Sequence, residues 1–345
     1  MNVIWNYDAA DKLTQRFTAL AEQGLEVAVC PEADDERLYR LLENAEVLWH
    51  CLRPVDAALL DAAPGLKLVQ KIGVGVNTID LEAARQRGVA VCNMPGTNSA
   101  AVAEHTLALM LAALRQVPRF DADVRAGRGW AWRSERQDGL GEIRGRTVGL
   151  VGYGGIPQLL APILTAMGAR VLYTARAARD TRQAEFRPLD ALIAESDIVS
   201  LHVPLTAETE RMLDRSRFRA MKPGAVLVNT ARGGLVDEAA LLDALEHGHL
   251  AAAGLDVFAT EPLPADHPLL HRPEVVLSPH VAWISGETFE RSLEVAVENC
   301  RRLAAGQDLL HRVDAGGGEH SALRPSTANR LSLPRSRKPP WPRPD

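Results

Sequence analysis

Several features that would assign a chain to other protein classes are absent from this sequence. Its few cysteines lie far apart and form no CxxC pair; they are Cys30, Cys51, Cys92 and Cys300. A zinc site or a disulfide framework is therefore not indicated, and we expect small buried thiols in a reducing compartment. No apolar run is long enough to span a bilayer, and the N-terminus shows no basic-then-apolar signal segment.

The chain also lacks a strong excess of charge of either sign. Its formal net charge of −5 argues against general binding to nucleic acids or to anionic membranes. The 345 residues are 46% hydrophobic and 24% charged, as in soluble globular proteins, and can form two domains with separate cores. These limits predict a cytoplasmic protein that needs no metal and binds no nucleic acid or membrane.

The stretch that organises the chain is 146–176. Short apolar runs predict β-strands at Thr147–Val151 and Arg170–Thr174, and apolar residues at helical spacing predict a helix over Leu159–Met167 between them. Gly168 stands where helices often end. This order predicts a strand–helix–strand unit of a parallel sheet.

The turn between the first of these strands and the helix is rich in glycine. Tight turns need backbone angles that glycine tolerates, as at Gly152, Gly154 and Gly155. The N–H groups of Gly155 and Ile156 would point at a pyrophosphate. Pro157 replaces the third glycine of the dinucleotide fingerprint, and a first helical turn accepts it because its missing N–H has no partner there. The turn predicts a dinucleotide site with some loss of helix packing.

The end of the second strand indicates which dinucleotide is bound. A site for NAD usually has an acidic side chain there for the ribose hydroxyls. This chain has Ala175 and Arg176 instead, with Arg179 nearby, and guanidinium groups can hold a 2′-phosphate. The sequence therefore favours NADP(H) over NAD(H). The alternative is that both arginines are ordinary solvated charges.

The first 80 residues or so predict a smaller α/β unit, because short apolar runs alternate with helical patterns. Within this unit a turn at Val74 and Gly75 follows a strand, and its backbone N–H groups could hold a carboxylate. A plain strand-to-helix turn is an equally good interpretation of this segment.

Three further segments complete the organisation of the chain. A strong helix is expected at 100–114, and a loop rich in Gly, Arg and Trp at 125–141. Burial under this loop is the favoured interpretation of Trp130 and Trp132, and the alternative is that they cover a cleft or an oligomer contact. A long amphipathic helix at 286–307 is expected to fold back over the N-terminal unit.

Strand after strand in the C-terminal half ends in a polar or charged residue. Because the carboxyl ends of parallel strands lie along one edge of a sheet, we expect these residues to converge. They are His202, Arg232, Asp256 with the nearby Glu261, and His280.

Three of these residues suit the reduction of a carbonyl group. Arg232 could grip a substrate carboxylate and polarise the neighbouring carbonyl. His280 could give a proton to the carbonyl oxygen as hydride arrives, while Glu261 orients the imidazole and stabilises its protonated form. Taken singly, each could be an ordinary surface or loop residue. Together at one sheet edge they indicate an oxidoreductase site.

These motifs together resemble the D-isomer-specific 2-hydroxyacid dehydrogenase family. The likeness runs from about Leu66 to Asp314 and rests on KIGVGVNTID, NMPGTNSAAVAEHTLALML, GLVGYGGIPQ, LHVPLTAET, VNTARGGLVDE, GLDVFATEPLP and SPHVAW. It implies two Rossmann-like, doubly wound parallel-sheet domains with a cleft between them, and a homodimer. The substrate domain would comprise residues 1–98 and 286–314, and the dinucleotide domain residues 99–285. Residues 315–345 are rich in Gly, Ser, Arg and Pro and predict a disordered tail.

The resemblance also implies roles for matching positions. Its catalytic residues correspond to Arg232, Glu261 and His280, and its substrate-carboxylate site to Val74 and Gly75. The cofactor-contacting positions are Gly155, Ile156, Val203, Thr230, Ala231, Asp256, Ala282 and Trp283. The NAD-selecting aspartate is replaced by Ala175 beside Arg176, which is similar to glyoxylate and hydroxypyruvate reductases that prefer NADPH.

The sequence thus predicts an NAD(P)-dependent D-2-hydroxyacid dehydrogenase that reduces a small 2-oxoacid. One alternative is a relative that takes hydride from another donor, such as formate or phosphite. Another is a non-catalytic, corepressor-like protein that senses dinucleotides. The complete set of Arg232, Glu261 and His280 argues against both, and no residue of the sequence identifies the oxoacid.

Overall fold

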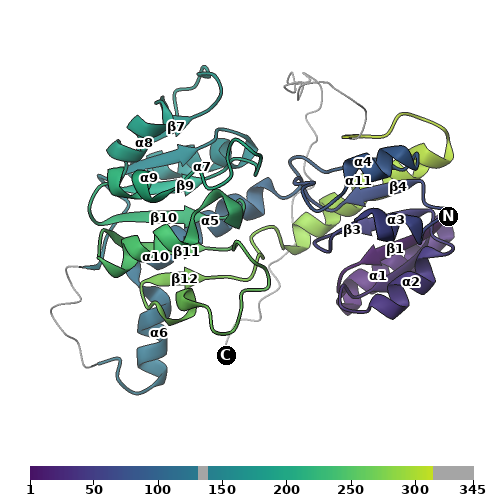
Figure 1. Ribbon diagram of the computed structural model, residues 1–345, viewed down its shortest axis with the longest axis horizontal. Coiled ribbons are helices and arrows are strands. Elements are labelled where there is room, and N and C mark those ends of the chain that lie inside the picture. The colour runs from purple at the N-terminus through teal and green to yellow at the C-terminus, as the bar shows by residue number, and fades with distance from the viewer. Residues whose placement is uncertain (131–138, 314–345) are drawn as a thin grey trace, which may run out of the picture. The chain divides into compact units, whose positions relative to one another are not determined.

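The computed structural model of the protein describes residues 1–130 and 139–313. This part of the chain contains two separate β-sheets, and every strand pair in both is parallel (Figure 1). The predicted α/β class with two doubly wound parallel sheets is therefore confirmed. The predicted tail at 315–345 and Trp132 lie outside the described residues.

The first sheet has five strands in the order β2-β1-β3-β4-β5. Its strands are β1 (Asn2–Asn6), β2 (Glu26–Cys30), β3 (Val47–His50), β4 (Leu68–Lys71) and β5 (Ala90–Cys92). The helices that follow them are α1 (Asp11–Leu20), α2 (Asp35–Leu42), α3 (Ala57–Asp61) and α4 (Leu81–Gln86), with a 3-10 turn at Ala21–Gln23. The chain runs from β1 to β2 on one side and then returns to β3 on the other, so the strand order reverses between β1 and β3.

Alternating residues of the first sheet pack on its two faces, as the period of a strand requires. Trp5 and Trp49 face one cluster, which also contains Leu293 and Val297 of the long helix α11 (Gly286–Ala304). Ile4 and its neighbours face the other cluster, with α2, α3 and α4. The C-terminal helix therefore packs on the N-terminal sheet, as predicted, although it ends at Ala304 rather than at 307.

The second sheet has seven strands in the order β12-β11-β10-β9-β6-β7-β8. Its strands are β6 (Thr147–Val151), β7 (Arg170–Thr174), β8 (Glu185–Phe186), β9 (Ile198–Leu201), β10 (Ala225–Asn229), β11 (Leu250–Leu255) and β12 (Val275–Leu277). One face is covered by α5 (Ser99–Arg115) and α7 (Gly155–Ala166). The other is covered by α8 (Leu189–Glu195), α9 (Arg215–Ala220) and α10 (Glu238–Glu246), and short 3-10 helices occur at Gly233–Leu235 and Pro268–His271.

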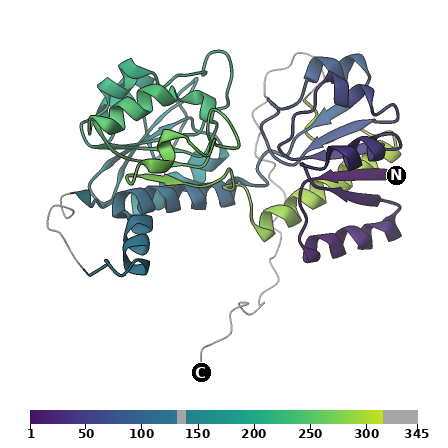
Figure 2. The same ribbon diagram turned by 60° about the horizontal axis from the view of Figure 1, so that its bottom comes forward.

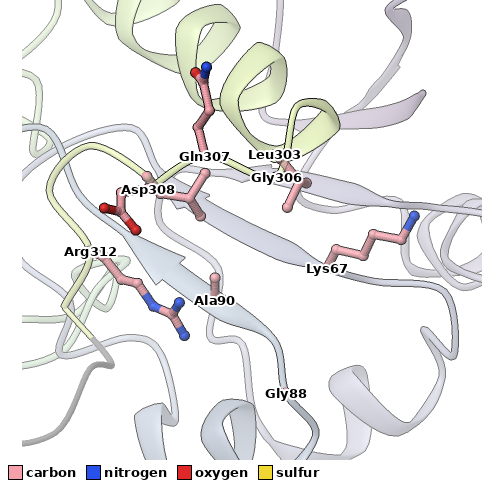
Figure 3. A pocket seen from close by; sticks show the side chains of 9 residues that line it. Lys67, Gly88, Ala90, Leu303, Gly306, Gln307, Asp308 and Arg312 are labelled. Carbon is pink, nitrogen blue, oxygen red and sulfur yellow. The ribbon is translucent and has the colours of Figure 1, made fainter.

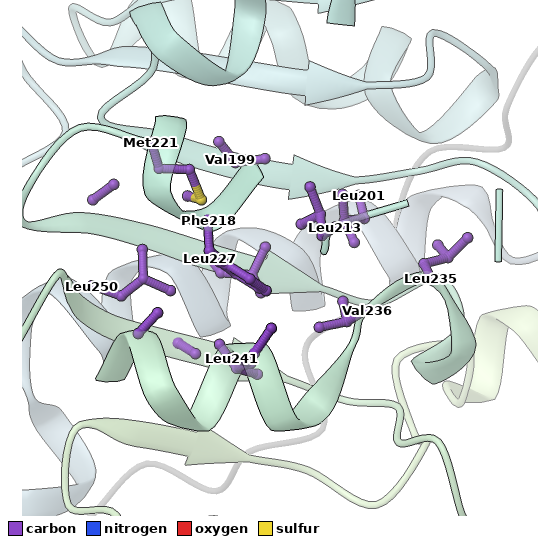
Figure 4. Packing of buried hydrophobic residues seen from close by; sticks show 14 of the residues in the cluster. Val199, Leu201, Leu213, Phe218, Met221, Leu227, Leu235, Val236, Leu241 and Leu250 are labelled. Atoms are coloured by element: carbon purple, nitrogen blue, oxygen red, sulfur yellow. The ribbon is translucent and has the colours of Figure 1, made fainter. Parts of the chain in front are cut away.

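The core under α9 and α10 is apolar and closely packed. Figure 4 shows Phe218, Met221 and Leu241 facing Val199 and Leu227 of the sheet. Each of these five side chains is at most 2% exposed. This layer holds β9 and β10 in place, and residues of the candidate site follow the carboxyl ends of these strands.

The structure differs from the sequence-based expectation in three places. The helix α6 (Val117–Arg125) was not predicted, and none of its side chains is buried. The apolar run Ala252–Phe258 predicts a strand along its whole length, but β11 ends at Leu255, which places Asp256 just beyond it. Trp130 is 93% exposed, so its expected burial beneath the loop is wrong.

Gly149 of β6 lies where α8 comes closest to the sheet. A Cβ atom at this position would collide with the side chains of Leu192 and Ser196. We expect Gly149→Ala to lower the free energy of unfolding by about 1–3 kcal/mol, because the packed helix must shift. Gly286→Ala is the control, since a Cβ there meets nothing within 4 Å. Denaturant titration of both variants measures the effect, and equal stabilities would contradict it.

Candidate active site

The candidate catalytic residues follow three neighbouring strands of the second sheet. Arg232 comes after β10, Glu261 lies in the segment after β11, and His280 comes after β12. Since all three strands are parallel, their carboxyl ends share one edge. The structure brings together the residues that the sequence predicted to converge there, with the exception of His202.

His280 and Glu261 form a close pair. The imidazole Nδ1 lies 2.6 Å from Oε2 of Glu261, and the other carboxylate oxygen accepts the Phe258 N–H at 2.9 Å. Burial alone would raise the pKa of Glu261, but hydrogen bonding to His280 and the Phe258 N–H, with the charges of His280 and Arg232, lowers it. Glu261 is therefore ionised at neutral pH, and it holds the His280 ring with Nε2 as the free nitrogen of the pair.

The backbone of His280 is held by Asp256. His280 has a φ of 53°, in the left-handed region that few non-glycine residues adopt. Its N–H donates to the Asp256 carbonyl at 2.7 Å, and the Asp256 carboxylate accepts the N–H groups of Val281 and Ala282 at 3.0 and 2.9 Å. The uncommon conformation is thus fixed by hydrogen bonds on both sides of the histidine.

The Asp256 carboxylate is fully buried and remains charged. Burial alone would raise its pKa, but hydrogen bonds from His105, Ser278, Ala282 and Val281 outweigh burial and lower it. The resemblance assigned Asp256 to the cofactor, whereas in the structure its side chain is engaged by the loop that carries His280. It lies at the same sheet edge as Arg232, Glu261 and His280.

Arg232 connects the edges of the two sheets. Its Nε donates to Oδ1 of Asn77 at 3.1 Å, and its Nη1 to the Ala231 carbonyl at 2.6 Å. A Cβ on Gly75 would collide with the guanidinium, so Arg232 lies directly against the Val74–Gly75 turn. Burial lowers the pKa of Arg232, while the charge of Glu261 raises it, and an arginine still stays protonated.

Two residues fix the loop that carries Arg232. The buried Asn229 side chain donates to the Arg232 carbonyl at 2.9 Å and accepts the Ala231 N–H at 3.0 Å. A Cβ on Gly233 would collide with the Phe258 backbone, so only glycine lets the Arg232 loop approach the segment that leads to Glu261. Sequence analysis did not identify Asn77 and Asn229, although both lie in the motifs KIGVGVNTID and VNTARGGLVDE.

The glycine turn after β6 has the shape of a dinucleotide cradle. Gly152 has a φ of 103°, and a Cβ there would come within 2.7 Å of the His202 carbonyl oxygen and 3.1 Å of the Val203 side chain. A Cβ on Gly154 would meet nothing within 4 Å, so space is open above the turn. No side chain in the described part of the chain caps α7, whose first turn contains Gly155 and Ile156.

These features fit a bound pyrophosphate. The N–H groups of the first helical turn have no intrahelical partners, and the helix dipole favours an anion there. Pro157 lies in this first turn and is buried, as predicted. The turn also lies at the point where the strand order reverses, between β6 and β9.

The remaining predicted cofactor positions surround this edge. Arg176 is exposed just after β7, the neighbour of β6. Thr230 is buried with its hydroxyl 2.8 Å from that of Thr106. Ala282 is buried, and the Trp283 ring packs against Tyr7 and Phe289 with ring centroids 5.7 and 5.6 Å away. The Trp283 side chain therefore belongs to the core of the first sheet.

His202 does not join the catalytic residues. Its Nε2 lies 2.9 Å from the Ser200 hydroxyl, and burial lowers the pKa of His202 to about 3. The ring is therefore neutral, and its contact with Ser200 turns it back toward the sheet. The prediction that His202 converges with the others rested on its strand-end position alone.

Sequence analysis did not identify Lys71, the last residue of β4. Its side chain is 5% exposed, its ammonium group contacts the Cys51 carbonyl, and its charge interacts with that of Arg232. Burial lowers the pKa of Lys71 to about 8, and the positive charge of Arg232 contributes. The neighbouring His50 is neutral, since burial lowers its pKa to about 3. A second buried cation therefore lies beside the Val74–Gly75 turn.

A separate cavity of about 610 Å³ lies at the opposite, amino-terminal side of the first sheet. Figure 3 shows Asp308 and Arg312 on one side of it and Lys67 on the other. None of the candidate site residues lines it.

Within residues 1–130 and 139–313 there is no group of three or more His, Cys, Asp or Glu side chains that could hold a metal. None of the helices in this part of the chain combines the length and the apolar character that crossing a membrane requires.

The low pKa of Lys71 predicts how stability depends on pH. Between pH 8 and 10.5 the unfolded chain keeps a proton that the folded chain has released, so the free energy of unfolding rises with pH. Over this window we expect the free energy of unfolding of the wild type to rise by up to about 3 kcal/mol more than that of Lys71→Met. Denaturant titrations across the window measure it, with exposed Lys12→Met as the control. Parallel curves for wild type and Lys71→Met would contradict the prediction.

Comparison with known proteins finds a matching family model and similar relatives. Residues 107–282 match the family model of the NAD binding domain of D-isomer specific 2-hydroxyacid dehydrogenases. The chain is 42% identical over 314 residues to D-3-phosphoglycerate dehydrogenase of Mycobacterium tuberculosis, covering 90% of this chain and 58% of that protein. It is 43% identical over 260 residues to glyoxylate reductase of Korarchaeum cryptofilum, covering 74% and 78%.

Among solved structures, the TT0316 protein from Thermus thermophilus superposes with a TM-score of 0.82. It is 43% identical, over 91% of this chain and 100% of that one. The chain thus spans 58% of the length of the phosphoglycerate dehydrogenase relative and 78% of the glyoxylate reductase. The chain belongs to the D-isomer specific 2-hydroxyacid dehydrogenase family.

Proposed function

We propose that the protein is an NAD(P)-dependent D-2-hydroxyacid dehydrogenase that reduces a small 2-oxoacid such as glyoxylate or hydroxypyruvate. The observation that carries the proposal is the arrangement of one acid pair and one cation at a single sheet edge. His280 is paired with Glu261 at 2.6 Å, and Arg232 lies against the Val74–Gly75 turn.

The carboxylate of the oxoacid would bind between Arg232 and the Val74–Gly75 turn. A planar guanidinium matches a carboxylate with two parallel hydrogen bonds, and the backbone N–H groups of the turn supply further donors. The Nε of Arg232 contacts Asn77 and its Nη1 donates one proton to the Ala231 carbonyl, which leaves Nη2 and the second Nη1 proton for the substrate. Because Arg232 is largely withdrawn from water, its attraction for an anion is stronger than that of a surface arginine.

His280 would supply the proton that the reduced carbonyl oxygen requires. Its Nδ1 faces Glu261, so its Nε2 is the nitrogen available to the substrate. The ionised Glu261 stabilises the imidazolium before transfer and orients the ring throughout. A nicotinamide dinucleotide bound at the glycine turn would supply the hydride. Arg232 then stabilises the negative charge that develops on the oxygen.

The reaction is tested by loss of nicotinamide absorbance with purified protein and a panel of 2-oxoacids. We expect turnover by the wild type and a fall in kcat of about 10²–10⁴-fold for His280→Gln, because the amide cannot transfer the proton. Fluorescence titration should show unchanged binding of the dinucleotide. Full activity of His280→Gln would exclude its role as the acid. Silence with every acid despite dinucleotide binding would favour the sensing protein.

We propose NADP(H) as the preferred cofactor. Arg176 follows β7 at the place where the adenosine ribose is expected, and Ala175 offers no carboxylate to repel a 2′-phosphate. The exposed position of Arg176 leaves its guanidinium accessible to a ligand.

The exchange Arg176→Asp tests this preference. We expect it to reverse the ratio of kcat/KM for NADPH to that for NADH, because the aspartate repels the phosphate and accepts the ribose hydroxyl. Arg179→Asp is the matched control, because it makes the same change of charge further along the loop, where the backbone N–H is bound to Tyr173. Its effect on the ratio should be smaller. An unchanged ratio in Arg176→Asp would show that Arg176 is an ordinary surface charge.

A second candidate substrate class is favoured by Lys71. A 2-oxoacid that also carries a phosphate, as the name of the phosphoglycerate dehydrogenase relative suggests, would place a second anion near this buried cation. Its charge and that of Arg232 could then act on two anionic groups of one molecule. The substrate panel distinguishes the classes when it includes the oxoacid of 3-phosphoglycerate beside glyoxylate.

We further propose that the protein is a cytoplasmic homodimer that associates through its dinucleotide domain, residues 99–285. Three apolar side chains in or near α6 are exposed, which a monomer in water would disfavour: Val117 by 55%, Val124 by 54% and Trp130 by 93%.

All four cysteines are buried thiols, which fits a reducing compartment. The substrate domain of this proposal comprises residues 1–98 and 286–314.

A further inference from the structure

Two adjacent residues of α5 contact the strand ends that lead to the two catalytic side chains. His105 lies 2.9 Å from the hydroxyl of Ser278, and Thr106 lies 2.8 Å from the hydroxyl of Thr230. Ser278 stands two residues before His280, and Thr230 two residues before Arg232. One turn of one helix therefore contacts both loops of the proposed site at equivalent positions.

The contact of His105 is directional. The Ser278 hydroxyl donates its single proton to the Asp256 carboxylate at 2.6 Å, so it can only accept from His105. The Nε2 of His105 must then carry a proton, and it also lies 3.5 Å from the same carboxylate oxygen. This chain of donors ends on the carboxylate that holds the N–H groups after His280.

The contact of Thr106 is directional in the same way. Its hydroxyl donates to the Val102 carbonyl one helical turn earlier, at 2.7 Å. Its oxygen is therefore the acceptor for the proton of Thr230. Both hydroxyls are buried, so no water could replace Thr106 as the acceptor of the Thr230 hydroxyl proton.

The helix that carries this pair is itself closely fitted to the second sheet. Figure 2 shows α5 running along one side of that sheet. A Cβ on Gly254 of β11 would come within 3.0 Å of Leu109, and a Cβ on Gly155 of the glycine turn within 3.2 Å of the Ser99 hydroxyl. Along its length α5 thus contacts the dinucleotide turn, the strand before Asp256, and the two loops of the catalytic residues.

We infer that His105 and Thr106 are positioning residues, with His105 setting the place of His280 and Thr106 that of Arg232. The inference rests on the proposed function. His280 acts in proton transfer, whereas Arg232 acts mainly in binding the carboxylate. Changes at two neighbouring positions of one helix should therefore affect different kinetic constants.

The test compares steady-state kinetics of four variants. His105→Ala is expected to lower kcat about tenfold with the KM for the oxoacid within about twofold, because the proton donor is misplaced. Thr106→Val is expected to raise the KM about tenfold with a smaller change in kcat, because the Arg232 loop loses its anchor. His105→Gln and Thr106→Ser restore the donor and the acceptor, and we expect each to recover most of the loss.

The control is Glu104→Gln, an exposed neighbour on the same helix, which should behave as wild type. Equal changes of kcat and KM in His105→Ala and Thr106→Val, or no rescue by the conservative variants, would overturn the inference. Lower thermal stability with unchanged kinetics would overturn it as well, since the residues would then be structural only.

A second readout does not depend on turnover. In protein labelled with ¹⁵N-histidine, the proton between His280 Nδ1 and Glu261 is assigned by its loss in His280→Gln. We expect this resonance to shift or broaden in His105→Ala and to stay unchanged in Thr106→Val and Glu104→Gln. An unchanged resonance in His105→Ala would overturn the role of His105. If the wild type reduces no oxoacid but the resonance shifts in His105→Ala, only the proposed function is refuted.

Discussion

The arrangement of the site depends on one buried carboxylate, that of Asp256. A charge removed from water is costly unless hydrogen bonds replace its hydration. Here the Ser278 hydroxyl and the N–H groups of Val281 and Ala282 provide them. These donors lie on both sides of His280, so stabilising the charge also determines the backbone of the histidine. The energetic requirement of the carboxylate and the backbone geometry of His280 are thus met by the same bonds.

Glycine has a comparable role where backbone segments must come close. At Gly75 and Gly233 a single Cβ atom would collide with the Arg232 side chain or with the Phe258 backbone. The space normally taken by a side chain is occupied there by the Arg232 guanidinium or by the next loop. This explains why the Arg232 loop, the Glu261 segment and the Val74–Gly75 turn can meet at one place.

The sequence predicted the fold and the convergence of Arg232, Glu261 and His280, because both follow from local patterns and from parallel topology. Strand ends are readable, and parallel strands share their carboxyl edge. It could not predict that His202 turns toward Ser200, since a strand-end position does not determine side-chain direction. The contacts of Asn77 and of His105 were likewise beyond reach, because they join segments 155 and 173 residues apart. Such pairings depend on tertiary packing, which no local pattern encodes.

The charges of the site point to the nature of its substrate. Lys71 is a buried cation and Arg232 a half-buried one, and within the described part of the chain the carboxylates that act on them are Glu261 and Glu32. Glu261 already forms a pair with His280, so its negative charge is shared between His280 and Arg232. Folding alone gains nothing from a buried ammonium placed near a guanidinium, since the two repel each other and both lose hydration. An anion bound between them would lower that cost, and the excess of positive charge therefore supports the proposal of an anionic substrate.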